Sequence, residues 1–169
     1  MAEFGQENVK KFLESYRLEV NKIEEGEEKT PDFEVSFQGE RVFFCEEKTL
    51  EYDDFEGCKN DSTYNAISNH IHKATKQFNS VNPNHDIPNV LAFTNLDTLK
   101  DIHDLFITIT GKALLEQGGL LKIRNVGRIE ADLDFIDLFL WFDKDKFINF
   151  MLGKNSKYEK DLLNIFGIK

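Results

Sequence analysis

Three residues in the first third of the chain have the types and spacing of a metal-dependent hydrolytic site. Asp32 follows a proline, and Glu46 and Lys48 come a hairpin's length later with one residue between them. Mg²⁺ in proteins is usually bound by one or two carboxylates, with waters and phosphate oxygens as its other ligands. Such an ion activates water against a phosphodiester, and a neighbouring lysine can position or deprotonate that water. Asp32 and Glu46 are therefore the candidate metal ligands, and Lys48 the candidate catalytic lysine.

These side chains converge only if the strands that carry them pair in the right register. Side chains alternate along a strand, so Glu46 and Lys48 project from one face. A two-residue loop at positions 38–39 would set Asp32 opposite Cys45, and the two acids would then lie on opposite faces of the sheet. A three-residue loop or a β-bulge would pair Asp32 with Glu46 instead. The site therefore requires one of these two irregularities.

Hydrophobic periodicity predicts the elements that position these residues. Helices are expected at 6–16, at 62–78 with Asp61 or Ser62 as N-cap, at 98–110, and after a capping box at Ser156-x-x-Glu159. Strands are expected at 17–23, 32–37, 41–48, 89–94 and 133–142. The order α-β-β-β-α-β-α-β-α predicts an α/β fold, with a mixed central sheet flanked by helices, in a single domain over residues 1–169.

The segment Thr30-Pro31-Asp32-Phe33, followed by Phe44-Cys45-Glu46-Glu47-Lys48-Thr49, resembles the signature of the PD-(D/E)xK nuclease superfamily. The family's succession of elements is similar to that expected over residues 6–94, and the resemblance says little about residues 95–169. It implies a restriction-endonuclease-like α-β-β-β-α-β core. It also implies Mg²⁺, with Mn²⁺ as a substitute, and cleavage of nucleic acid, DNA in preference to RNA.

The chain departs from the family pattern at two positions. Gln6 stands where members often carry a further acid on the first helix. Glu47 stands where an apolar residue usually packs; it could face solvent if that face of the sheet is uncovered, and its backbone carbonyl could still bind metal. By resemblance, Lys73 and Gln77 on the helix after the lysine are candidate phosphate contacts, because four residues of separation put them on one side of a helix.

The charge distribution suggests an alternative function for the chain. The net charge is -10, and residues 1–57 hold 17 acids against 7 basic residues, whereas residues 58–169 hold 14 of each. A polyanionic duplex is usually met by a positive surface. The stretch 59–128, with Lys112, Lys122, Arg124 and Arg128 near turns, could supply a modest DNA track, and a homo-oligomer or partner subunit could supply more. The alternative is a catalytically inactive interaction module on the same scaffold, which binds a protein partner through its acidic face.

The remaining signals concern location and the other candidate ligands. Cys45 and Cys58 have no metal-ligand spacing, and no apolar run approaches the roughly 20 residues of a membrane helix. A cytoplasmic protein with no membrane contact is expected. His70 and His72 point about 200° apart on a helix, cannot bind one metal there, and are expected at the surface.

Overall fold

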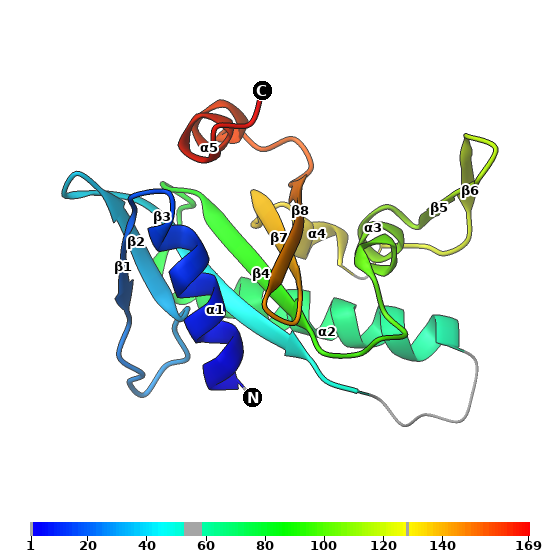
Figure 1. Cartoon of the computed structure of the whole chain (residues 1–169), viewed down its shortest axis with the longest axis horizontal. Coiled ribbons are helices and arrows are strands. Elements are labelled where there is room, and N and C mark those ends of the chain that lie inside the picture. Colours follow the sequence, from blue (N-terminus) through cyan, green and yellow to red (C-terminus); the bar gives the residue numbers. More distant parts are fainter. Residues whose placement is uncertain (1, 53–58, 128) are drawn as a thin grey trace.

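The computed structural model describes residues 2–52, 59–127 and 129–169, and it is an α/β structure. Its elements in chain order are α1 (Ala2–Glu14), β1 (Glu19–Lys22), β2 (Phe33–Phe37), β3 (Glu40–Leu50), α2 (Lys59–Val81), β4 (Asn89–Asn95), α3 (Ile102–Thr110), β5 (Lys112–Leu114), β6 (Leu120–Lys122), α4 (Glu130–Leu133), β7 (Leu138–Asp143), β8 (Lys146–Leu152) and α5 (Glu159–Phe166). The central sheet has the order β1-β2-β3-β4-β7-β8 and is flanked by helices (Figure 1). Because β3, β4 and β7 are parallel and the outer pairs antiparallel, the predicted mixed sheet is confirmed.

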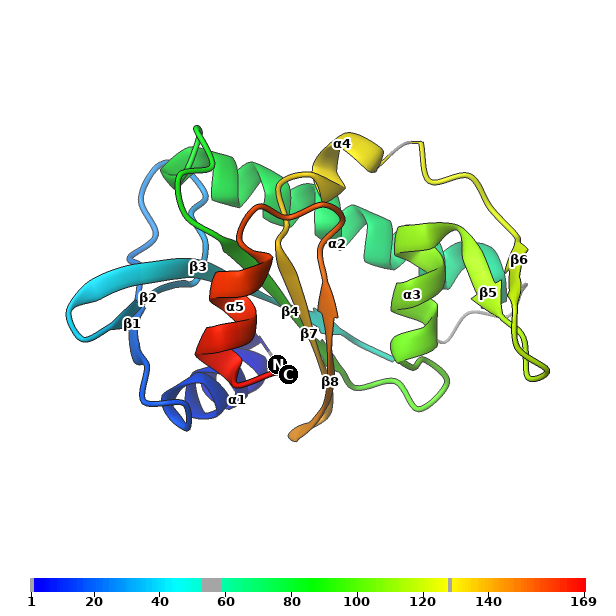
Figure 2. The same ribbon diagram turned by 90° about the horizontal axis from the view of Figure 1, so that it is seen from above.

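The sheet separates two apolar cores, one against each face. Helices α1 and α5 pack on one face, while α2 and α3 pack on the other (Figure 2). The apolar stripe predicted for α2, which is Ile67, Ile71, Ala74 and Phe78, is fully buried against the sheet. Burial of each of the larger side chains of this stripe stabilises the fold by about 1.5–3 kcal/mol. The opposite side of α2 is therefore the one that points away from the sheet. Within the described residues, no helix is long and apolar enough to cross a membrane.

The β2–β3 hairpin contains the irregularity that the site requires. Its turn has two residues, Gln38 and Gly39, with φ of 51° and 81°, the left-handed conformations that such tight hairpin turns need. Beyond the turn the register shifts, because β3 carries one residue more than β2, which is a β-bulge. Phe33 consequently pairs with Cys45, and Asp32 comes level with the next residue of β3. The bulge, not a three-residue loop, supplies the change of face.

The structure corrects several predicted elements. The apolar run 133–142 is not one strand, because α4 ends at Leu133 and β7 begins only at Leu138. The hairpin β5–β6 and strand β8 were not predicted; the first has only three residues a strand and exposes most of its leucines. Short strands without alternating burial leave no period-2 signal. The predicted helix 62–78 is longer, beginning by Lys59, so neither Asp61 nor Ser62 is its N-cap.

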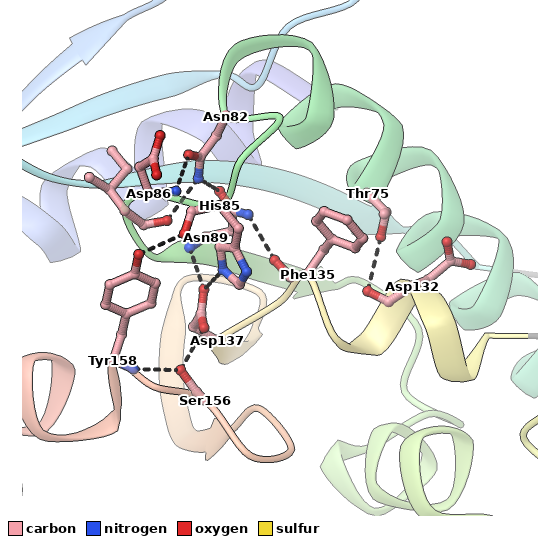
Figure 3. A network of polar contacts seen from close by, with 11 residues as sticks. Thr75, Asn82, His85, Asp86, Asn89, Asp132, Phe135, Asp137, Ser156 and Tyr158 are labelled. Carbon is pink, nitrogen blue, oxygen red and sulfur yellow. Dashed lines mark hydrogen bonds and ion pairs between the residues drawn. The ribbon is translucent and has the colours of Figure 1, made fainter.

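The predicted capping box at Ser156 is also wrong. Helix α5 begins at Glu159 with Tyr158 as its N-cap and no side-chain cap. The Ser156 hydroxyl donates to Asp137 Oδ1 at 2.5 Å and accepts the backbone N–H of Tyr158 at 3.1 Å, one residue before the N–H that a capping box uses. Asp137 also binds His85 Nε2 at 2.6 Å and accepts the backbone N–H of Asn89 at 2.8 Å (Figure 3). Asp137 is thus the shared partner of a serine and a histidine. This geometry ties three loops together and does not make His85 a base for a serine nucleophile.

A glycine beside this network gives the first prediction. A Cβ on Gly153 would lie 2.0 Å from the carbonyl oxygen of Ile136 and 2.9 Å from the Cα of Asp137, both backbone atoms. We expect Gly153→Ala to lower the free energy of unfolding by about 2 kcal/mol, since neither chain segment can move without breaking the network. Chemical denaturation measures it, with Gly26→Ala as control because its Cβ would meet nothing within 4 Å. Equal stability of the two variants would contradict the prediction.

Candidate active site

The predicted site residues line one cleft. It has a volume of about 980 Å³ and lies where β3, the loop before β2 and the C-terminal half of α2 meet. Asp32, Glu46, Lys48, Lys73 and Gln77 all contribute to its wall. The structure therefore brings together five residues from three separate segments of the chain.

Asp32 and Glu46 are held side by side by hydrogen bonds. The backbone N–H of Asp32 donates to Glu46 Oε2 at 2.9 Å. The carboxylate of Asp32 accepts Gln6 Nε2 at 2.7 Å on one oxygen and the backbone N–H of Glu47 at 2.8 Å on the other. Helix α1 thus places Gln6 directly on the acid, at the position where the family pattern has a carboxylate. The amide donates to Asp32 and adds no negative charge.

Lys48 is fixed between the acid and helix α2. Its Nζ donates to Glu46 Oε1 at 2.5 Å and to Gln77 Oε1 at 2.7 Å. Gln77 in turn donates through Nε2 to the carbonyl of Thr30 at 2.9 Å, two residues before Asp32. Gln77, expected as a phosphate contact, therefore positions Lys48 and the loop before β2. Lys73 lines the cleft one helical turn away.

Glu47 does not face solvent, because the face of the sheet onto which it projects is covered. Its side chain points to the opposite face of β3 and is only 5 % exposed, because α1 covers it. Gly5 of α1 makes the space: a Cβ there would lie 2.2 Å from Glu47 Oε1. The hydroxyl of Thr49 donates to the same oxygen at 2.8 Å. A glycine in the first turn of an amphipathic helix was the available sequence signal for this buried acid.

Burial raises the pKa of all three acids. It raises the pKa of Glu46 to about 7, with the charge of Asp32 adding to the effect and Lys48 opposing it. It also raises the pKa of Asp32, against the opposing hydrogen bond from the Glu47 N–H and the charge of Lys48. The pKa of Glu47 is raised to about 7, again chiefly by burial. Near neutral pH the cluster therefore retains protons that a bound cation would displace.

His70 differs from the surface position expected for it. Its ring packs edge-on against Phe93 with centroids 6.4 Å apart, and burial lowers its pKa to about 4, with Lys48 and Lys73 adding to the shift. The spacing 70, 73 and 77 repeats at helical intervals and could have placed His70 on the side of α2 that faces the site. His72 is exposed, as expected, and its Nδ1 lies 3.0 Å from Asp132.

The donor set fits one class of metal. Within residues 2–52, 59–127 and 129–169, no group of three or more histidines, cysteines and acids is arranged to hold an ion. Asp32 and Glu46 therefore offer two carboxylates as hard oxygen ligands, with lone pairs left beyond the hydrogen bonds described above. Mg²⁺ binds in this way, completing its shell with waters and substrate oxygens, whereas a structural Zn²⁺ needs four protein ligands.

Comparison of the chain with protein-family models, with curated proteins and with solved structures finds no match. The geometry and chemistry of the cleft therefore carry the functional argument.

Proposed function

We propose that the chain is a metal-dependent nuclease with a PD-(D/E)xK-type site on a restriction-endonuclease-like core, acting on DNA in preference to RNA. Asp32 and Glu46 are the metal ligands, with Mg²⁺ as the cofactor and Mn²⁺ as its substitute. Lys48 is the catalytic lysine. One observation carries the proposal: an acid immediately before β2, an acid on β3 and the lysine two residues after that second acid are joined in one hydrogen-bonded cluster inside a cleft.

The arrangement of the cluster supports distinct roles for its members. Glu46 is only 2 % exposed and Asp32 is partly buried, so the attraction of the two carboxylates for a bound cation is weakly screened by water. When bound, Mg²⁺ would supply Lewis-acid stabilisation of the phosphate and a lower pKa for the attacking water. Gln6 orients Asp32, and Gln77 holds the Lys48 ammonium at the edge of the cleft. From there Lys48 can hold the water or stabilise charge on the phosphate during attack.

A second candidate function rests on the loop before β2. Glu24, Glu25, Glu27 and Glu28 are all exposed there, and the loop forms one wall of the cleft. Such a surface favours a catalytically inactive module that binds a basic protein partner. A thermal-shift titration separates the candidates: a nuclease site predicts stabilisation by Mg²⁺ or Mn²⁺ that disappears in Asp32→Ala and Glu46→Ala. Stabilisation by a basic peptide, with no metal response, would favour the interaction module.

The place of Gln6 gives a prediction about metal affinity. We expect Gln6→Glu to tighten Mg²⁺ binding about tenfold, because a third carboxylate would join the two ligands, and to lower stability without metal through added repulsion. Isothermal titration calorimetry and thermal unfolding measure the two effects. Gln117→Glu is the matched control, since it makes the same change at an exposed position of the loop between β5 and β6. Unchanged affinity in Gln6→Glu would remove α1 from the site.

A further inference from the structure

A second hollow, of about 560 Å³, lies on the other flank of α2. Its polar lining comes from two segments: α2 contributes Asn65, Asn69 and His72, and the chain after β6 contributes Arg124 and Asn125. Asp132 closes one side and binds His72. None of these residues belongs to the catalytic cluster.

The donors in this hollow suit the edge of a nucleobase. Asparagine amides donate and accept at once, and arginine donates two parallel hydrogen bonds, which are the groups that recognise bases. The guanidinium of Arg124 is held in place, because it lies 5.2 Å over the ring of Tyr64. One asparagine is engaged internally, since Asn125 Oδ1 accepts the backbone N–H of Gly127 at 2.9 Å. Asn65 and Asn69 lie exposed on the α2 side of the hollow.

The same helix connects the hollow to the cleft. Asn65 and Asn69 line the hollow, while Lys73 and Lys76 line the cleft, and the four positions follow one another on the face of α2 that points away from the sheet. At 1.5 Å per residue, Asn65 and Lys76 are about 16 Å apart along the axis, which corresponds to about five nucleotides of a stacked helical strand at 3.4 Å each, and to fewer if the strand is extended. Figure 2 shows α2 running along the sheet from the side of α3 and β5 towards β3.

The distribution of charge around the cleft favours one route for an anionic ligand, which runs along α2 from the cleft to the hollow. No Asp or Glu occurs between Ser62 and His85, although the chain contains 31 acids. The opposite wall of the cleft carries Glu25 and Glu28. An anionic backbone leaving the catalytic cluster is therefore repelled by the loop before β2 and attracted towards the side formed by α2.

We propose that a single-stranded nucleic acid segment lies across the exposed face of α2, with phosphates at Lys73 and Lys76 and a base in the hollow against Asn65, Asn69 and Arg124. The inference rests on the proposed function for the identity of the ligand. A single strand is favoured because the donors line a hollow, which a base must enter, whereas bases of a duplex are read by side chains that project into a groove. The affinity of the protein for a nucleic acid strand should then depend on the length of that strand, and not only on the nucleotides at the site of cleavage.

Length-dependent binding tests this path. The probes are fluorescein-labelled single-stranded oligonucleotides from about three to about fifteen residues, spanning the estimated path, measured by anisotropy with EDTA on the full-length Asp32→Asn chain. We expect affinity to rise with length and Arg124→Gln to weaken the long probes about tenfold while leaving the shortest unchanged. Arg41→Gln is the matched control, since its guanidinium also lies 5.2 Å over an aromatic ring, that of Phe44. Asn69→Leu should weaken the long probes without changing charge.

The outcomes separate this inference from the proposed function. Equal effects of Arg124→Gln and Arg41→Gln, equal effects on short and long probes, or no gain with length would overturn the path. Duplex probes with the same dependence on Arg124 would overturn the single-stranded assignment, and paired deoxyribose and ribose probes identify the sugar. If the parent chain cleaves nothing but binding remains dependent on Arg124, only the proposed function fails. If cleavage occurs and Arg124→Gln is neutral at every length, only the path fails.

Discussion

Replacing Lys48 with alanine should slow cleavage by two to three orders of magnitude, on the order of one oxyanion-type contact, while leaving metal binding intact. The ammonium contacts Glu46 and Gln77 and supports the reacting groups, but it is not a ligand, so its loss removes about 10²–10³-fold in rate. Asp32→Ala and Glu46→Ala should lose about 10⁴-fold or more and also lose metal binding, because each supplies one of only two ligands. Single-turnover cleavage assays and calorimetric Mg²⁺ titrations measure both quantities on the same samples.

The control for this series is Lys10→Ala, which removes an exposed lysine of α1 whose partner Glu14 lies 3.9 Å away. It should change neither rate nor metal affinity. Full activity in Lys48→Ala would remove the lysine from the mechanism. Loss of metal binding in Lys48→Ala would instead mean that the ion pair with Glu46 holds the ligand geometry, and the division of roles given above would be wrong.

The second large effect concerns stability against pH. Glu46 and Glu47 each have a pKa raised to about 7 from an ordinary value of 4.5. Between these values the folded chain binds more protons than the unfolded chain, so the free energy of unfolding falls as pH rises and the loss is complete above about pH 7. The expected fall is a few kcal/mol, because each unit of pKa corresponds to about 1.4 kcal/mol. Chemical denaturation across this pH range, in EDTA, measures it.

Mg²⁺ should recover part of this lost stability at neutral pH and almost none at acid pH, where protons compete for the same oxygens. The recovery is partial because Glu47 lies under α1 on the other face of β3 and keeps its own pH dependence. Without metal, Asp32→Asn should be more stable than the parent, because one negative charge is removed and Gln6 can reverse its amide to hydrogen-bond the new side chain. The variant should not respond to metal, because it lacks one of the proposed carboxylate ligands. A flat pH profile in EDTA, or an equal metal response in both chains, would contradict this account.

Sequence reasoning predicted the site residues by their types, and it identified what their convergence required of the hairpin. It could not choose between a longer loop and a bulge, because both satisfy the alternation of faces and the choice depends on the turn at Gln38 and Gly39. The buried stripe of α2 was predictable because a long helix with a regular apolar repeat has only one face that can pack against the sheet. The coarse α/β class followed from the same patterns.

The residues that sequence reasoning placed wrongly depend on tertiary contacts. Glu47 would have faced solvent only with its sheet face uncovered, but α1 covers that face, and Gly5 of α1 makes room for the acid. Ser156 had the spacing of a capping box, but its hydroxyl donates to Asp137 of a distant loop and accepts the N–H of Tyr158, and helix α5 begins only after Tyr158. The β5–β6 hairpin was missed because three-residue strands with exposed leucines carry no periodic signal. Arg128 and Cys58 lie outside the described residues.

The central claim is that Asp32, Glu46 and Lys48 form a metal-dependent site for phosphodiester cleavage, and one measurement tests it most directly. End-labelled single-stranded, duplex and branched DNA, with the matching RNAs, are incubated with the full chain in Mg²⁺, in Mn²⁺ and in EDTA, beside Asp32→Asn. We predict cleavage of at least one DNA substrate in either metal, none in EDTA and none by the variant. Equal cleavage by parent and variant, or no cleavage of any substrate despite a folded parent chain, would contradict the account.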